Sequence, residues 1–165
     1  ETGLALRIDQ PTQGRVRLRF GHSTELLELT AEGGAGQDRT RLRATGDGLV
    51  MERPSENFSS QLARVSGTPD PAGLSGRYRS AELDAELAIV DAGGALYGSV
   101  SGFLGQGRME LLEQVGPDLW LLPCPRALDY GPPGEWTLAF ERDAAGQAVA
   151  VQVGCWLARG LRYLR

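Results

Sequence analysis

Apolar and polar residues alternate along most of the chain with a period of two, which is the period of a half-buried β-strand. In Arg15–Phe20, for example, Val16, Leu18 and Phe20 occupy one face and arginines occupy the other. Similar short runs recur to the end of the chain, separated by clusters rich in glycine, proline and aspartate. The pattern therefore predicts an all-β protein of many short strands joined by turns.

The predicted strands fall into two successive meanders, residues 4–66 and residues 76–165. Between them, residues 67–75 contain helix-capping residues and a proline at a helix-start position, so we expect a linker with one short helical turn. No long helix is available to connect parallel strands. We therefore predict an antiparallel up-and-down barrel of about eight to ten strands, with residues 1–165 forming a single domain.

The chain has no lysine, and all 17 of its basic residues are arginine. This composition excludes Schiff-base chemistry, a lysine general base and a phosphate-binding P-loop lysine. The net charge is −4, and neither sign gathers into a block, so we expect no nucleic-acid partner. We also expect a soluble chain without a membrane partner, because it shows no signal-peptide pattern and no apolar stretch of roughly 18 to 20 residues. The compartment stays open.

Side chains that commonly carry catalysis or bind metals are sparse. His22 is the only histidine, and its neighbours do not form a nucleophile-elbow pattern. Cys124 and Cys155 lack the paired spacing of zinc ligands, and the sequence does not decide whether they form a disulfide. The scattered carboxylates show no calcium-loop order, and nothing selects a catalytic pair among them. We therefore expect no catalytic residue, no metal site and no cofactor.

Most of the large aromatic residues lie in the second meander. Core filling is their first interpretation, and a pocket for a small apolar ligand is the alternative. Barrels of about eight strands either fill themselves with side chains or hold one small ligand, and the sequence does not distinguish these cases. If a pocket exists inside the barrel, we predict that its ligand-binding residues are Tyr97, Trp120, Trp136, Phe140 and Trp156.

Three stretches of the second meander resemble a known family, in the same order and with matching spacing. Leu74–Leu87 is similar to a G-x-Y-x-S-x-E-L-D strand entry, Leu138–Gly146 to an F-x-R-D-x-x-G hairpin, and Gly160–Arg165 to a closing strand. These stretches are typical of the C-terminal lipocalin-like β-barrel domains of serine beta-lactamase-related, penicillin-binding-protein-like hydrolases, in the D-aminopeptidase and esterase group. The resemblance implies that the predicted barrel is lipocalin-like.

The catalytic motif of that family is Ser-x-x-Lys, which a chain without lysine cannot contain. The resemblance thus implies a non-catalytic accessory barrel, whose partner is a serine hydrolase catalytic domain upstream on the same polypeptide. Loops Gly102–Gly107 and Pro123–Gly134 are candidates for shaping its substrate cleft. The alternative hypothesis is a free-standing lipocalin-like binding protein for a small apolar ligand. An enzyme that uses paired carboxylates ranks last.

Overall fold

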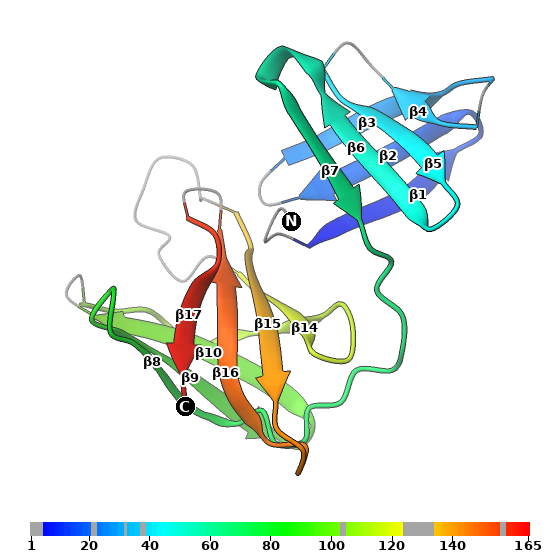
Figure 1. Ribbon diagram of the computed structural model, residues 1–165. Helices are drawn as coiled ribbons and strands as arrows, with labels where there is room; N and C mark the ends of the chain where they lie inside the picture. The colour runs from blue at the N-terminus through cyan, green and yellow to red at the C-terminus, as the bar shows by residue number, and fades with distance from the viewer. Residues whose placement is uncertain are drawn as a thin grey trace. The chain divides into compact units, whose positions relative to one another are not determined.

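The chain folds into two compact units, Leu6–Val65 and Ser66–Arg165, with Ala5 belonging to the second (Figure 1). Each unit contains one antiparallel sheet and a hydrophobic core of its own. The predicted all-β class and the two successive meanders are therefore confirmed. That the two units form a single domain stays a prediction. The computed structural model describes residues 5–20, 23–31, 33–36, 39–102, 105–123, 134–155 and 158–165.

The first unit is a seven-stranded sheet in which neighbours along the chain are also neighbours in the sheet. Leu18 and Leu27 are fully buried in its core. The sequence pattern does not predict the first strand, because Asp9, Gln10 and Pro11 interrupt its apolar alternation. The strands are β1 (Leu6–Thr12), β2 (Arg15–Phe20), β3 (Ser23–Leu29), β4 (Ala35–Gly36), β5 (Arg41–Thr45), β6 (Gly48–Arg53) and β7 (Phe58–Leu62).

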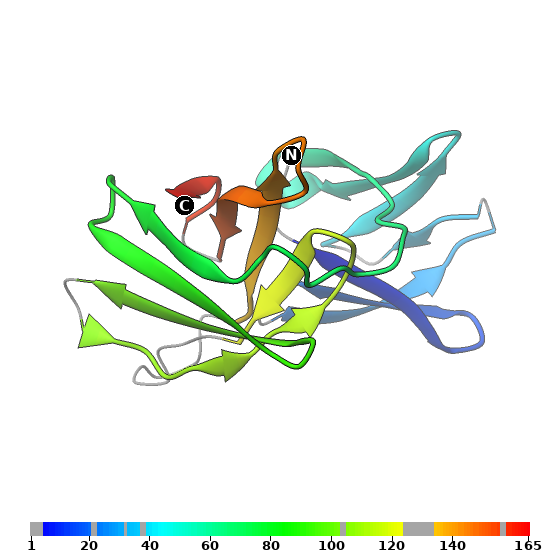
Figure 2. The ribbon, with the colours of Figure 1, turned by 90° about the horizontal axis from the view of Figure 1, so that it is seen from below.

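The second unit is a ten-stranded sheet that wraps around its core (Figures 1 and 2). Its first strand pairs with its last through Arg79 and Leu164. β12 pairs with β10 near one end of the sheet, and β13 pairs with β14 at the other end. Because only Leu112 separates β12 from β13, the two ends of the sheet meet there. The strands are β8 (Gly76–Ser80), β9 (Ala85–Ala92), β10 (Ala95–Gly102), β11 (Gly105–Gln106), β12 (Glu110–Leu111), β13 (Glu113–Gln114), β14 (Leu119–Leu122), β15 (Trp136–Arg142), β16 (Ala148–Gly154) and β17 (Leu161–Leu164).

The up-and-down antiparallel arrangement is thus confirmed, but the strands divide between two curled sheets instead of encircling one core. The physical reason is that each meander buries its own apolar face, and the pairing of β17 with β8 completes the second sheet without strands from the first.

The linker between the meanders forms one hydrogen-bonded turn and no helix. Leu74 N donates to Pro71 O at 3.2 Å, and Gly73 then takes a left-handed conformation with φ of +73°, which cannot continue a helix. The one helical segment in the described part of the chain is the 3₁₀ turn η1 (Pro54–Glu56), which begins with the proline that such a turn favours. None of the described helical residues forms a segment of the length and apolarity that crossing a bilayer requires.

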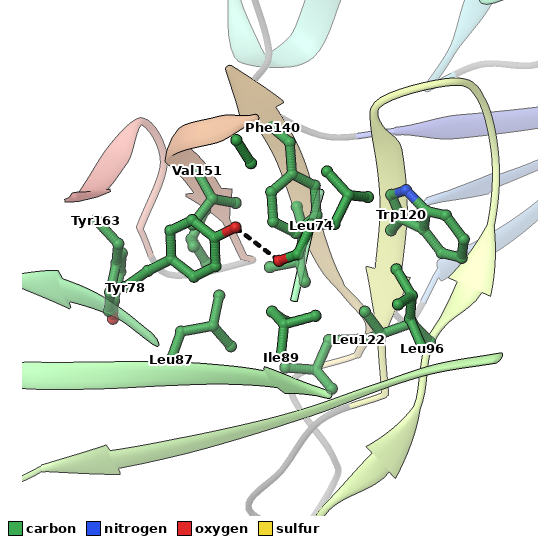
Figure 3. Packing of buried hydrophobic residues seen from close by; sticks show 14 residues of the cluster. Leu74, Tyr78, Leu87, Ile89, Leu96, Trp120, Leu122, Phe140, Val151 and Tyr163 are labelled. Carbon is green, nitrogen blue, oxygen red and sulfur yellow. Dashed lines mark hydrogen bonds between the residues drawn. The ribbon is translucent and has the colours of Figure 1, made fainter. Parts of the chain in front are cut away.

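The core of the second unit is the larger of the two and is rich in aromatic side chains (Figure 3). Tyr78, Trp120 and Tyr163 are each at most 1% exposed. The rings of Tyr78 and Phe140 meet edge to face, with centroids 5.7 Å apart. Burial of each large apolar side chain contributes about 1.5–3 kcal/mol to folding, so this cluster is the main source of stability in the second unit.

Candidate functional site

The aromatic residues predicted to line a ligand site lie at different depths in the second unit. Trp120 and Phe140 are core residues, with 1% and 6% exposure, and the partly buried Trp136 packs against the same core. Tyr97 instead lies on the face of β10 that points away from the core. Trp156 is outside the described residues. Three of the five residues thus converge, and a ligand-binding role for them stays a prediction.

Two indole N–H groups of this core have no hydrogen-bond acceptor within the described part of the chain. They belong to Trp120 on β14 and Trp136 on β15, which project from the same face because Trp120 pairs with Leu138 and Trp136 pairs with Leu122. A buried donor without an acceptor costs about 1–3 kcal/mol. A water molecule or a bound group that accepts from these N–H groups would therefore be stabilised here.

The outer face of the same sheet carries a recess of about 440 Å³ that the sequence pattern does not reveal. Ser99 lies at this recess and is only 3% exposed, although its side chain points away from the core. Its hydroxyl donates to Gly107 O at 2.8 Å, in the segment between β11 and β12 that follows the edge of β10. The residues that line the recess include Arg77, Glu86, Ala88, Val90, Ser99 and Met109.

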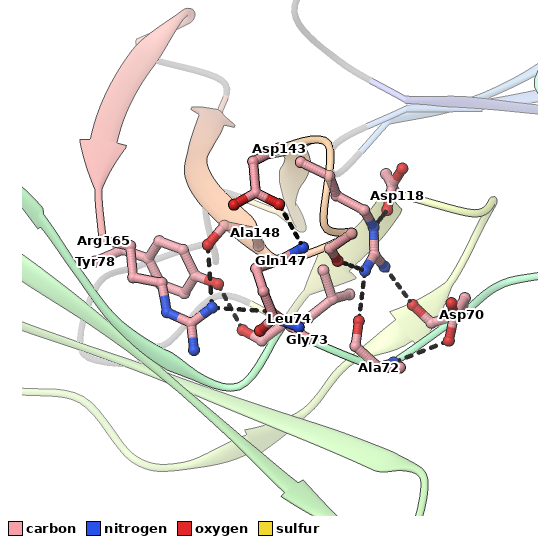
Figure 4. Close-up of polar contacts among 12 residues, drawn as sticks. Asp70, Ala72, Gly73, Leu74, Tyr78, Asp118, Asp143, Gln147, Ala148 and Arg165 are labelled. Carbon is pink, nitrogen blue, oxygen red and sulfur yellow. Dashed lines mark hydrogen bonds and ion pairs between the residues drawn. The ribbon is translucent and has the colours of Figure 1, made fainter.

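Arg142 joins the linker to the second sheet through acceptors that include Asp70, Ala72 and Asp118, all labelled in Figure 4. Arg142 Nε donates to Asp118 Oδ1 at 2.6 Å, and Nη2 donates to Asp70 O at 2.8 Å. Nη1 donates to Ala72 O and to Gly146 O. The Arg142 side chain is 17% exposed, and its planar fork reaches all four acceptors at once, which a lysine could not do. We call these contacts the Arg142 clamp.

The C-terminal arginine extends the same attachment. Arg165 donates to the carbonyl oxygens of Gly73 and Ala148 at 3.1 Å and of Ser75 at 2.7 Å. Gly73 is required at this point, because a Cβ there would lie 2.9 Å from Gly146 O and its backbone is left-handed. The linker from Asp70 to Ser75 is therefore held by two guanidinium groups before β8 begins.

The stretches that carry the family resemblance build this junction. Tyr78, from the first stretch, donates its hydroxyl to Leu74 O at 2.6 Å, and burial raises the pKa of its phenol. Phe140 and Arg142, from the second, supply the ring that contacts Tyr78 and the clamp. Within the first stretch, residues 81–84 form a turn, and β9 begins at Ala85. These motifs therefore specify a fold junction.

A family model described as D-aminopeptidase, domain B, matches residues 1–164. The chain belongs to that family. It is 52% identical over 172 residues to the D-aminopeptidase of Gluconobacter oxydans (strain 621H). It is 46% identical over 165 residues to the D-aminopeptidases of Brucella ovis and Brucella canis. Each match covers the whole of this chain and 32% of the relative, so the chain spans about a third of the length of these relatives.

The predicted resemblance to an accessory domain of the D-aminopeptidase group is thereby confirmed. A match to one third of longer proteins gives no support to the free-standing carrier. The described residues of this domain B chain contain no group of three or more His, Cys, Asp or Glu side chains that could hold a metal ion. Cys155 is partly buried and forms no disulfide within the described residues, and His22 and Cys124 lie outside them.

The loops predicted to shape a substrate cleft are described only in part. Residues 103–104 of the first loop and 124–133 of the second lie outside the described residues. Sequence reasoning missed both the Arg142 clamp and the outer recess. The clamp had a signal, because Arg142 belongs to one of the resembling stretches. No sequence signal indicates the recess, because its lining residues come together only through the register in which the strands pair.

Proposed function

We propose that this chain is a non-catalytic accessory domain of a serine hydrolase of the D-aminopeptidase type. It packs on the catalytic part of the same polypeptide and shapes the substrate cleft there. The observation that carries the proposal is the match to domain B over the whole chain, combined with a coverage of only 32% of the relatives. The relatives have about twice as much additional polypeptide, which is ample for a catalytic domain.

The composition supports this division of labour. A serine hydrolase of this group activates its nucleophile with lysine, and this chain has none, so the nucleophile and its base must come from the rest of the polypeptide. An aminopeptidase must also hold a free amino terminus and exclude chains that extend beyond it. A neighbouring domain can do this by limiting access to the cleft, provided that it is rigid.

The Arg142 clamp and the Arg165 contacts supply such rigidity in the second unit. Arg142 and Arg165 donate to four backbone carbonyls of the linker: Asp70 O, Ala72 O, Gly73 O and Ser75 O. Arg142 also donates to Asp118 Oδ1 in the β13–β14 turn and to Gly146 O in the β15–β16 turn, so the linker is held against these two turns. Charge-assisted hydrogen bonds of this kind are stronger than neutral ones. A surface built on this unit keeps its shape when it contacts a neighbour.

The proposal predicts that the purified 165-residue chain has no hydrolase activity. The chain and its full-length parent are incubated with D-alanine p-nitroanilide and, separately, with a fluorophosphonate that acylates activated serines. We expect the parent to release nitroaniline and to be labelled at a serine outside residues 1–165, and the chain alone to do neither. Circular dichroism with a β-sheet spectrum serves as the folding control. Turnover by the folded chain, or a label on one of its own serines, would contradict the proposal.

A further inference from the structure

An apolar row crosses the outer face of the second sheet, where a solvent-facing sheet would carry polar residues. Val90 on β9 pairs with Tyr97 on β10, and Tyr97 pairs with Leu111 on β12. Directly paired residues project from the same face, so these three side chains form one row. Val90 is 46% exposed and Leu111 is 53% exposed. The row thus presents large apolar side chains to the surroundings of this unit.

The outer recess adjoins this row. Val90 belongs to both, and Met109, which is 45% exposed, lines the recess two residues before Leu111. Ala88 and Ser99 pair with each other at the recess. Because both side chains are small, they leave the space that forms the recess unfilled. Arg77 and Glu86 line it as well and form an ion pair. Apolar side chains beside a hollow, with a charged pair next to them, are the usual composition of a protein–protein interface.

On β15–β17 the outer face carries charged and polar side chains beside the exposed Leu164, whereas Val90, Tyr97 and Leu111 form an unbroken apolar row on β9, β10 and β12. On β15–β17, Glu141 accepts from Arg162 at 2.7 Å and from Gln152 at 3.0 Å. The hydrogen bond from Arg162 is the main reason that the pKa of Glu141 lies below its usual range. Around Glu141 the outer surface of the sheet is therefore polar. The row on β9, β10 and β12 is therefore better suited to a partner than to water.

We infer that the outer face formed by Val90, Tyr97, Met109 and Leu111, with its recess, docks against the remaining two thirds of the parent polypeptide. We call it the docking face. The inference rests on the proposed function and names the surface through which it is exerted. The lengths of the relatives identify what lies on the docking face. In each relative, the stretch that matches this chain is covalently joined to about twice its own length of additional chain.

Covalent attachment favours this occupant over a separate molecule. A tethered partner has an effective concentration of about 1 mM or more, so even a modest apolar contact is occupied most of the time. The chemistry of the face also defines its complement. The partner surface should place aliphatic or aromatic side chains on Val90 and Leu111, insert one of them into the recess, and match the Arg77–Glu86 pair with polar groups.

Thiol labelling in the full-length parent protein tests the docking face. Leu111→Cys is compared with Leu164→Cys, because the two leucines lie on strands of the same sheet and are both 53% exposed in this chain. Each variant is reacted with a maleimide under native conditions, and peptide mapping by mass spectrometry separates the new thiol from native cysteines. We expect Leu111→Cys to react at least about tenfold more slowly than Leu164→Cys, because the attached polypeptide covers it. Equal rates would overturn the inference.

The protein concentration distinguishes the attached polypeptide from a second copy. Protection of Leu111→Cys that is constant on dilution of a monomer supports the inference, whereas protection that is lost as a dimer dissociates overturns it. A rapidly labelled Leu111→Cys, in a parent whose activity still depends on residues 1–165, would reject the docking face and leave the proposed function intact. Hydrolysis by the chain alone would reject the proposed function whatever the labelling rates.

Discussion

Replacing Arg142 by methionine should lower the free energy of unfolding of the second unit by about 3 kcal/mol. Methionine keeps most of the apolar stem but removes every donor of the clamp. The Asp118 carboxylate and the carbonyl groups of Asp70, Ala72 and Gly146 then lose a charged partner in a site where the arginine is 17% exposed. Because these contacts fix the linker, the loss of Arg142 also exposes the part of the core around Leu74, a residue that is fully buried in the native structure.

Urea unfolding followed by tryptophan fluorescence measures this loss in the second unit alone, since all three tryptophans of the chain belong to residues 66–165. Arg162→Met is the matched control. That arginine is 56% exposed and pairs only with Glu141 among the contacts described for it, so its replacement should cost no more than about 1 kcal/mol. Equal losses for the two variants would show that the clamp contributes no more than a surface ion pair.

Replacing Trp120 by alanine should be about as damaging, with a loss of about 3–5 kcal/mol. The side chain is 1% exposed and packs in the core of the second unit, so its removal leaves a cavity that the sheet cannot close. Trp120→Phe separates the packing of the ring from the role of the indole N–H. Because Nε1 has no acceptor within the described residues, its removal forfeits no hydrogen bond there.

We therefore expect Trp120→Phe to cost less than about 1.5 kcal/mol, well below the cost of Trp120→Ala. The same urea titration measures both variants, with Trp136 still available as a reporter. A loss for Trp120→Phe close to that for Trp120→Ala would mean that the indole N–H is bound to an acceptor in solution. The interpretation of this region as a packed core with a free donor would then be wrong.

The fold class was predictable because alternation and turn residues are local signals. Arg15–Phe20 and the glycine-rich breaks suffice to predict short antiparallel strands. The division into two sheets was not predictable, because it depends on which distant strands pair. The contact between Arg79 and Leu164 closes the second sheet, and nothing in either strand specifies the other. The first strand escaped prediction because polar residues and Pro11 mask its periodicity.

The candidate site residues were predictable only where the type of side chain and its position in the alternating pattern indicate which face of the strand it occupies. Trp120 and Phe140 lie in the core because they share the apolar phase of their strands, which alternation makes predictable. The position of Tyr97 on the outer face is harder to predict, because the phase of β10 is ambiguous around its small residues. The acceptors of the Arg142 clamp are mainly backbone carbonyls, which every residue possesses. The docking face could not be predicted from the sequence, because Val90 and Leu111 share a row only through the register in which both pair with Tyr97 on β10.

Steady-state kinetics of the parent protein can show whether this domain acts on a catalytic neighbour, as we propose. The values of kcat/KM for D-alanine p-nitroanilide and for a longer peptide that begins with D-alanine are measured in the intact parent and in a parent lacking residues 1–165. Fluorophosphonate labelling verifies that the shortened protein retains its reactive serine. We predict that the ratio of the two kcat/KM values changes by at least about tenfold, which corresponds to about 1.4 kcal/mol in the transition state. Two unchanged kcat/KM values would contradict the claim.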